Sequence, residues 1–258
     1  MAAPFGFPDY HLVDSPTDGF WRVTSWRNPF EPKDPAPPVG EIDAAEDEAG
    51  RFDDPDGIHR TLYCSSEAEG ALCDKIAAFL LNPRVARRIE AFLVEEPDPE
   101  FADEDLTPTL DEDMIDGFNW QLAWAPSAKG ARFVDLWHWS TCAALLPHVG
   151  ELLANFALKA LDVRALADER RGFTRRLAGI VRRGATGDDG QLRSAGIRYT
   201  SRLPPRWTCW ALWEPLALDT AQMTTTRVTI DTPELRRAAN KLGVVLAGPQ
   251  ETSHQESP

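Results

Sequence analysis

The chain reads GRFDDPDGIHRTLYCSSEAEGALCDKIAAFLL over Gly50–Leu81. This stretch combines a Gly-Arg loop, a turn rich in Pro, Asp and Gly, a short strand around Leu62–Cys64 and the start of a helix. Ser66 and Glu69 have the spacing of a capping box, and apolar residues recur from Leu72 at i, i+4, i+7 and i+8. The stretch therefore predicts a strand followed by a helix with one side in the core.

The opposite side of this helix carries the chemically informative residues. At 100° per residue it presents Glu67, Gly70, Asp74 and Ala78, with the two carboxylates about 10 Å apart. Small residues beside a carboxylate let a ligand approach closely. The alternative is a solvated face with two ordinary acids.

Length and charge limit the classes of function. The 258 residues suit one large domain, and the net charge of −14 argues against non-specific nucleic-acid binding, which depends on clustered Lys and Arg. The charge is uneven: every charged residue in 95–116 is acidic, whereas 164–206 is rich in arginine. We interpret the acidic run as a solvated insertion rather than a metal site.

Compartment and metal content follow from the cysteines and the N-terminus. The four cysteines and five histidines show no zinc-site spacing, so we expect no metal and a reducing cytoplasm. Residues 1–12 lack the basic and apolar regions of a signal peptide, and no apolar run reaches the length of a transmembrane helix. We expect a cytoplasmic protein without a membrane partner.

The remaining elements predict a mixed chain. Further strands are expected at 20–23, 131–137, 196–201, 207–213 and 225–230, and further helices at 82–93, 168–184 and 232–242. Residues 140–161 suit a helix or a bent strand pair, with the helix favoured. The strand at 207–213 is apolar on both faces, which is typical of a buried central strand. We therefore predict a compact α+β domain with a central sheet flanked by helices.

The domain boundaries come from composition. Residues 1–19 form an N-terminal extension, 20–247 a single domain, and 248–258 a disordered tail. Two insertions are expected within the domain, near 28–49 and 95–130. The first contains five prolines and is either a lid or a plain insertion.

No common catalytic motif occurs: the chain has no P-loop, GxGxxG, GxSxG or HExxH. His138 lies between two tryptophans, an environment more typical of a packed residue than of a catalytic one. Glu67 and Glu69 form a Glu-x-Glu pair, but Glu69 already has the capping role. What remains is a dispersed set of arginines, a tyrosine, a carboxylate and a serine, which suits a phosphate-bearing ligand.

The order of several short motifs resembles the RES-domain family. The motifs are FWRV at 20–23, GRF at 50–52, LYC at 62–64, GALCD at 70–74, 171–178, GIRYTSR at 196–202 and CWAL at 209–212. The resemblance spans 20–216. It implies a fold similar to the ADP-ribosyltransferase toxins, cleavage of NAD at the nicotinamide–ribose bond with phosphate, water or a protein as acceptor, and an Xre-type helix-turn-helix antitoxin as partner.

The resemblance also assigns site residues. Arg51, Tyr63, Asp74 and Ser201 take the catalytic positions, and Arg22 joins Arg51, Tyr63 and Ser201 as an expected NAD-binding residue. Asp74 is one methylene shorter than the glutamate of the family. The alternative is therefore a RES-like protein that binds a nucleotide or a partner with weakened or no turnover.

The chemistry implied by the resemblance suits these residue types. Cleavage develops positive charge on the ribose, so a fixed carboxylate stabilises the transition state, and arginines bind the pyrophosphate. Tyr63 would flank the nicotinamide, and Ser201 would bond to the ribose or the amide.

The arginines of 170–183 offer either a docking face for an acidic partner or an ordinary solvated helix face.

Overall fold

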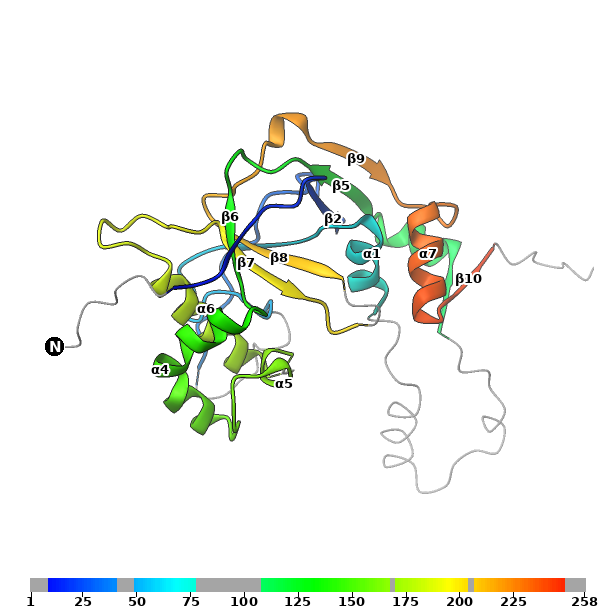
Figure 1. The fold of residues 1–258 in the computed structure, drawn as a ribbon. Helices are drawn as coiled ribbons and strands as arrows, with labels where there is room; N and C mark the ends of the chain where they lie inside the picture. Colours follow the sequence, from blue (N-terminus) through cyan, green and yellow to red (C-terminus); the bar gives the residue numbers. More distant parts are fainter. Residues whose placement is uncertain (1–8, 41–48, 78–107, 168–169, 204–206, 249–258) are drawn as a thin grey trace, which may run out of the picture.

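The computed structural model describes residues 9–40, 49–77, 108–167, 170–203 and 207–248. The predicted helix at 82–93, Asp168, the first part of the acidic segment and the tail from 249 onwards lie outside these residues. Figure 1 shows the arrangement, with the helices at the two ends of a curved sheet.

Eight strands of the described chain form one mostly antiparallel sheet. Its order is β1-β6-β7-β8-β3-β2-β5-β9, and only β6 and β7 pair in parallel. The strands are β1 (Leu12–Asp14), β2 (Phe20–Thr24), β3 (Thr61–Ser65), β5 (Gln121–Ala125), β6 (Arg132–Asp135), β7 (Gly196–Thr200), β8 (Thr208–Trp213) and β9 (Thr224–Arg227). With its flanking helices, this sheet confirms the predicted α+β class.

The central position of β8 explains its sequence. Cys209, Ala211 and Trp213 face one apolar cluster, and Trp210 and Leu212 face another. Both faces of the strand are therefore buried, as the double-sided apolar pattern predicts.

The sheet opens between β3 and β2. These strands are registered only at Trp21↔Ser65, whereas β2 and β5 pair over five residues and β3 and β8 over another five. A single registered residue pair cannot keep two five-residue strands adjacent along their whole length. The strands β2 and β3 therefore separate beyond Trp21 and Ser65. The separation leaves room for the cavity described below.

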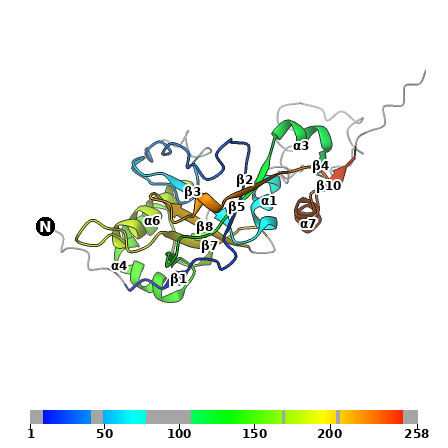
Figure 2. The ribbon, with the colours of Figure 1, turned by 90° about the horizontal axis from the view of Figure 1, so that it is seen from above.

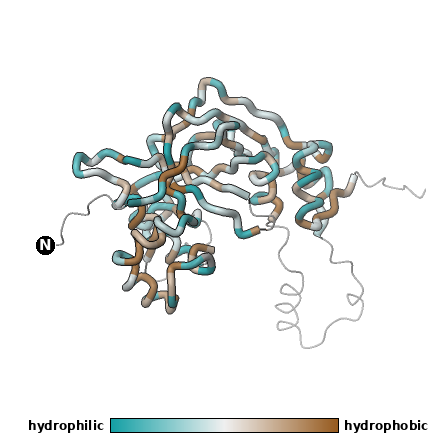
Figure 3. The backbone as a smooth tube through the Cα atoms, in the orientation of Figure 1, coloured by the Kyte–Doolittle hydropathy of each residue, from teal (hydrophilic) through white to brown (hydrophobic). Residues whose placement is uncertain are grey.

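Helices cover the sheet at both ends (Figures 1 and 2). At one end α4 (Trp139–Asn155), α5 (Val163–Leu166) and α6 (Arg171–Gly184) pack on β6, β7 and β8. At the other end α1 (Ala68–Ile76) packs against α7 (Pro233–Leu242), near α3 (Glu112–Phe118) and the two-stranded sheet of β4 (Thr109–Asp111) and β10 (Val245–Ala247). Figure 3 shows the apolar segments gathered around α4 to α6 and in the central strands.

The signals at the ends of α7 are confirmed. Thr232 is the N-cap, Pro233 opens the helix, and Gly243 ends it in the left-handed region at φ 70°. Residues 140–161 are mainly helical, as favoured, and the side chain of His138 accepts from the Ser140 amide to cap α4.

The capping box predicted for α1 is wrong. The N-cap is Glu67 rather than Ser66, and it makes no side-chain capping bond. Ser66 Oγ instead accepts from Trp210 Nε1 at 2.8 Å, and the Glu69 carboxylate pairs with Arg237 and Lys241 of α7. Both polar groups thus use long-range partners that local spacing cannot reveal.

The predicted boundaries need adjustment at two places. Residues 12–14 of the expected extension form β1, which pairs with β6 at the edge of the sheet. The expected insertion at 95–130 contains β4, α3 and β5, and β5 lies between β2 and β9. The later part of that segment therefore belongs to the sheet.

Within the described residues, we find no helix that is both long and apolar enough to cross a bilayer.

Candidate functional site

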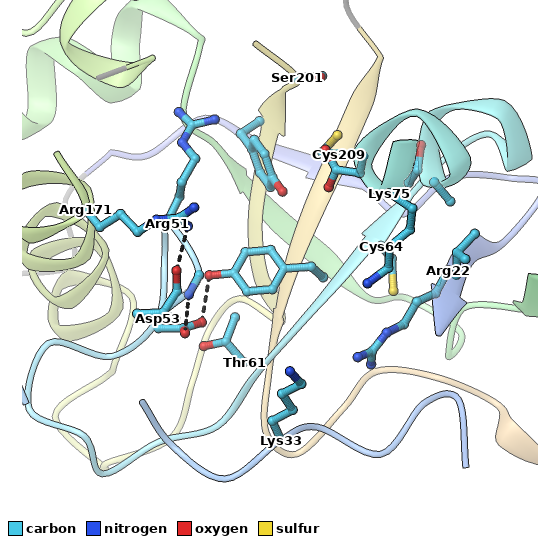
Figure 4. Close-up of a pocket in the computed structure, with 18 of the residues that line it drawn as sticks. Arg22, Lys33, Arg51, Asp53, Thr61, Cys64, Lys75, Arg171, Ser201 and Cys209 are labelled. Carbon is cyan, nitrogen blue, oxygen red and sulfur yellow. Dashed lines mark hydrogen bonds between the residues drawn. The ribbon is translucent and has the colours of Figure 1, made fainter. Parts of the chain in front are cut away.

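A cavity of about 1420 Å³ lies where β2 and β3 separate. Its walls come from β2, β3, α1, the end of β7 and two loops, 33–37 and 49–53. Figure 4 shows the side chains of these elements pointing into it. The volume exceeds that of most small-ligand pockets, which are about 300–1,000 Å³.

All five residues predicted for the site line this one cavity. Arg22 comes from β2, Tyr63 from β3 and Asp74 from α1, while Arg51 lies in the loop before β3 and Ser201 follows β7. Because these elements are distant in sequence, the sheet and α1 bring the five together.

Arg51 is held in a defined orientation. Its Nη2 donates to the Leu166 carbonyl, and its guanidinium lies 5.1 Å from the Phe52 ring and 5.6 Å from the Tyr199 ring. Its buried Nε has no hydrogen-bond partner among the described residues. Burial lowers the pKa of the guanidinium.

The Tyr63 hydroxyl is already bonded within the protein. It donates to Asp53 Oδ1 at 2.7 Å and accepts from the Phe52 amide at 2.8 Å. Burial raises the pKa of Tyr63 well above its usual range. A role in proton transfer is therefore disfavoured, and the part of Tyr63 available to a ligand is its aromatic ring.

Asp74 is the carboxylate of the α1 wall. It is accessible from the cavity, yet burial within the surrounding protein raises its pKa. The positive charges of Lys75, Arg51, Arg202 and Arg171 oppose this shift without overcoming it. The carboxylate thus faces the cavity, is partly desolvated by the surrounding protein and lies within the electrostatic reach of four cations.

Ser201 is buried at the end of β7. Its Oγ accepts from the Leu203 amide at 3.1 Å, and its own amide donates to the Trp207 carbonyl at 2.8 Å. The hydroxyl therefore holds the turn after β7 and keeps its own proton for a ligand acceptor.

Several lining residues were not anticipated from the sequence. They are mostly cationic or aromatic: Trp21, Trp26, Lys33, Lys75, Arg171, Tyr199 and Arg202. Lys75 adjoins Asp74 in the sequence, and that adjacency could have indicated it. No sequence signal distinguishes Lys33, which a proline-rich loop brings in, whereas Arg171 begins the 171–178 motif of the resemblance.

The rival site residues lie elsewhere. Glu69 is held by α7, and neither it nor Glu67 lines the cavity. His138 stacks on His11 with ring centroids 3.7 Å apart and caps α4, so it is a packed residue as interpreted. Among the described residues, no group of three or more His, Cys, Asp or Glu could hold a metal ion.

The arginines of 170–183 are mostly turned toward the protein rather than toward solvent. Within α6, Arg175 is buried, Arg171 donates to the Ala49 carbonyl at 2.6 Å, and Arg182 lies over the Trp213 ring. Only Arg183 among the α6 arginines is exposed. Arg170 and Arg183 are exposed, so the solvated-face interpretation holds for these two arginines, whereas Arg171, Arg175 and Arg182 bond inward to loops and rings.

Comparison with family models, curated proteins and solved structures finds no match for this chain.

Proposed function

We propose that the chain is a RES-type enzyme that cleaves the nicotinamide–ribose bond of NAD. The observation that carries the proposal is the position of one carboxylate, Asp74, on the wall of a cavity whose other charges are mostly cationic. The convergence of Arg22, Arg51, Tyr63 and Ser201 on the same cavity supports it.

The charge of the cavity suits a dinucleotide. Among the described lining residues, six are cationic (Arg22, Lys33, Arg51, Lys75, Arg171 and Arg202) and three are carboxylic (Asp34, Asp53 and Asp74). This local excess of positive charge stands against a net charge of −14 for the chain. A pyrophosphate would find charge-assisted donors here that the remaining surface offers less often.

The aromatic walls suit the bases of the same ligand. The Tyr63 and Tyr199 rings and the indoles of Trp21 and Trp137 line the cavity. Flat rings beside cations are the surroundings that a nicotinamide or adenine ring and a phosphate require together.

The reaction assigns a task to each group. The electron pair of the C–N bond leaves with nicotinamide, which becomes neutral, while positive charge develops on the ribose carbon. The Asp74 carboxylate would stabilise that charge, and Arg51 would bind the pyrophosphate. Phosphate then bonds to the ribose carbon to give a phosphorylated ADP-ribose, or water does so and releases a proton.

The proposal includes an ADP-ribosyltransferase-like fold and an Xre-type antitoxin as partner. The opening of the sheet between β2 and β3, with the cavity in it, supports the first. The second rests on the motif order alone. A cytoplasmic location is part of the same proposal.

A binding protein without turnover is the second candidate. It is favoured by the short side chain of Asp74, because a carboxylate misplaced by about 1 Å can cost 10²-fold in rate.

The deciding experiment measures NAD consumption by the purified chain with and without phosphate, followed by separation of the products. We expect phosphate-dependent release of nicotinamide, and a loss of about 10²-fold or more in Asp74→Asn. Asp116→Asn is the matched control, since Asp116 is an exposed helical carboxylate outside the cavity.

Two results would favour the binding protein instead. The first is tight NAD binding with no turnover in either condition. The second is turnover that appears only in Asp74→Glu, which restores the length of the family's side chain.

A further inference from the structure

A second group of cations lines the cavity away from Arg51 and Arg171. Arg22 comes from β2, Lys75 from α1 and Lys33 from the proline-rich loop, and all three extend toward one space in Figure 4. Their mutual influence confirms the proximity: burial lowers the pKa of Lys75 most, and the charges of Arg22 and Lys33 lower it further.

Among the described residues, cations outnumber the carboxylates near this group. Arg22 Nη1 is buried without a hydrogen-bond partner among the described residues. The Lys33 ammonium lies 5.4 Å from the Trp26 ring, a cation–π contact. Among the described residues, Asp74 is the carboxylate that raises the pKa of Lys75, and Asp34, beside Lys33 in the sequence, also lines the cavity. Within the described part of the chain, three cations thus lie beside two carboxylates, and positive charge remains in excess.

Such an arrangement is unfavourable without an anion. Like charges held near one another repel, and desolvation of Arg22 adds to the cost. An anion with several oxygens would accept bonds from all three side chains at once, because they approach from three different elements. A dianionic phosphate meets that requirement better than a carboxylate, which has one charge and two oxygens.

We infer that Arg22, Lys33 and Lys75 form a binding subsite for a phosphate group within the cavity. The group would be either free inorganic phosphate or a phosphate monoester on the dinucleotide, in addition to its pyrophosphate. The role of the subsite in catalysis rests on the proposed function, but its ability to bind phosphate does not.

The test measures the dissociation constant of inorganic phosphate by calorimetry for the full chain and for a Lys33→Gln/Lys75→Gln double variant. Both lysines are exposed, so the variant should fold, and a melting curve checks this. We expect phosphate affinity to fall at least 10-fold. Lys129→Gln removes an exposed lysine outside the cavity and should leave the affinity unchanged.

A second arm distinguishes the two sources by comparing NAD with NADP. If NADP affinity falls at least 10-fold in the double variant while NAD affinity changes less than about 3-fold, the group is a monoester on the ligand. If the affinities for NAD and NADP change equally in the double variant, and only the stimulation of turnover by phosphate is lost, the group is inorganic phosphate.

Two outcomes refute the subsite. In the first, the double variant binds phosphate and NADP with the same affinities as the unmodified chain. In the second, the unmodified chain does not bind phosphate, and its affinity for NADP is no higher than its affinity for NAD. These outcomes are separable from failure of the proposed function. If phosphate binding depends on the two lysines but NAD is not turned over, the result supports the subsite and not the proposed enzyme. If NAD is turned over without any need for phosphate and phosphate does not bind, the result supports NAD hydrolysis and not the subsite.

Discussion

At the scale of single residues, Asp74 combines a position on the cavity wall with an energetic cost. Burial raises its pKa above the ordinary value of 3.8, even though Lys75, Arg51, Arg202 and Arg171 all act to lower it. Desolvation therefore outweighs the attraction of four cations. A ligand that develops positive charge beside this carboxylate would supply the interaction that water no longer provides.

The raised pKa has a consequence for stability. The folded protein holds the Asp74 proton more tightly than the unfolded chain, so ionisation of Asp74 disfavours the folded state as pH rises above about 3.8. We expect Asp74→Asn to stabilise the ligand-free protein at pH 7, while turnover is lost. The gain should shrink as pH falls toward 4, because the native carboxyl takes up its proton as the pH approaches its raised pKa. Urea unfolding at both values checks this.

Asp116→Asn again provides the comparison, because its exposed ion pair with Arg227 should contribute less than about 1 kcal/mol. An Asp74→Asn variant that is less stable than the native protein at pH 7 would contradict the interpretation.

Gly50 shows how closely the site is packed. A Cβ at this position would lie 2.3 Å from Tyr63 Cε2 and 2.4 Å from its Oη. The Gly50 amide also donates to Asp53 Oδ2 at 2.6 Å, and Asp53 in turn accepts from Tyr63. Only glycine lets the loop backbone contact the ring this closely.

Gly50→Ala should therefore destabilise the protein by about 1–3 kcal/mol, since the ring or the loop must move. Gly117→Ala is the control: Gly117 lies in α3 with nothing within 4 Å of an added Cβ, so alanine should be neutral or stabilise by about 0.5–1 kcal/mol. Equal unfolding free energies for the two variants would argue against the close packing.

At the scale of elements, the described part of the proline-rich loop is a fixed wall of the cavity. The side chain of Arg175, only 1% exposed in α6, donates to the carbonyls of Pro37 and Asp54. The Val39 amide donates to the Pro55 carbonyl at 2.8 Å. These bonds fasten residues 37–39 to the turn before β3, which favours a static wall over a lid.

Arg175→Met should release this wall. Each lost charge-assisted hydrogen bond to a buried carbonyl costs about 1.5–3 kcal/mol of folding free energy. Removal of the buried guanidinium charge offsets part of this cost. We expect a net loss of about 1–3 kcal/mol and faster tryptic cleavage after Lys33. Arg176→Met, which changes a side chain over the Phe156 ring, should leave cleavage after Lys33 unchanged. Unchanged cleavage in Arg175→Met would show that other contacts hold the loop.

At the scale of the whole molecule, charge is divided between surface and cavity. The chain carries a net −14, whereas cations outnumber carboxylates among the described cavity residues. The positive charges of the cavity should therefore favour binding of an anionic dinucleotide, whereas the negative net charge of the chain opposes it.

Salt should weaken that binding. Between about 0.05 and 1 M NaCl the screening length falls to about 3 Å, so NAD affinity should decrease by roughly 10-fold. Calorimetric titration at several salt concentrations measures the trend. Neutral nicotinamide is the control and should bind with nearly constant affinity. A salt-independent affinity for NAD would mean that the cavity cations do not contact its phosphates.

Local patterns were sufficient for much of the fold, and the resemblance led to five cavity residues. The double-sided apolar run at 207–213 predicts the central strand β8, and Thr232, Pro233 and Gly243 mark the ends of α7. These features depend on backbone geometry and burial within a few neighbouring residues, so the sequence alone determines them. Motif order led to Arg22, Arg51, Tyr63, Asp74 and Ser201.

Long-range contacts decided the rest. The capping box failed because Glu69 pairs with Arg237 and Lys241 of α7, 168 and 172 residues away. Arg171 and Arg175 of α6 turned inward to carbonyls. Lys33 and Arg171 reach the cavity only through the loop and helix that carry them. A charged side chain takes the partner that the assembled chain brings closest, so its role depends on tertiary structure, whereas strand and helix positions follow from local sequence.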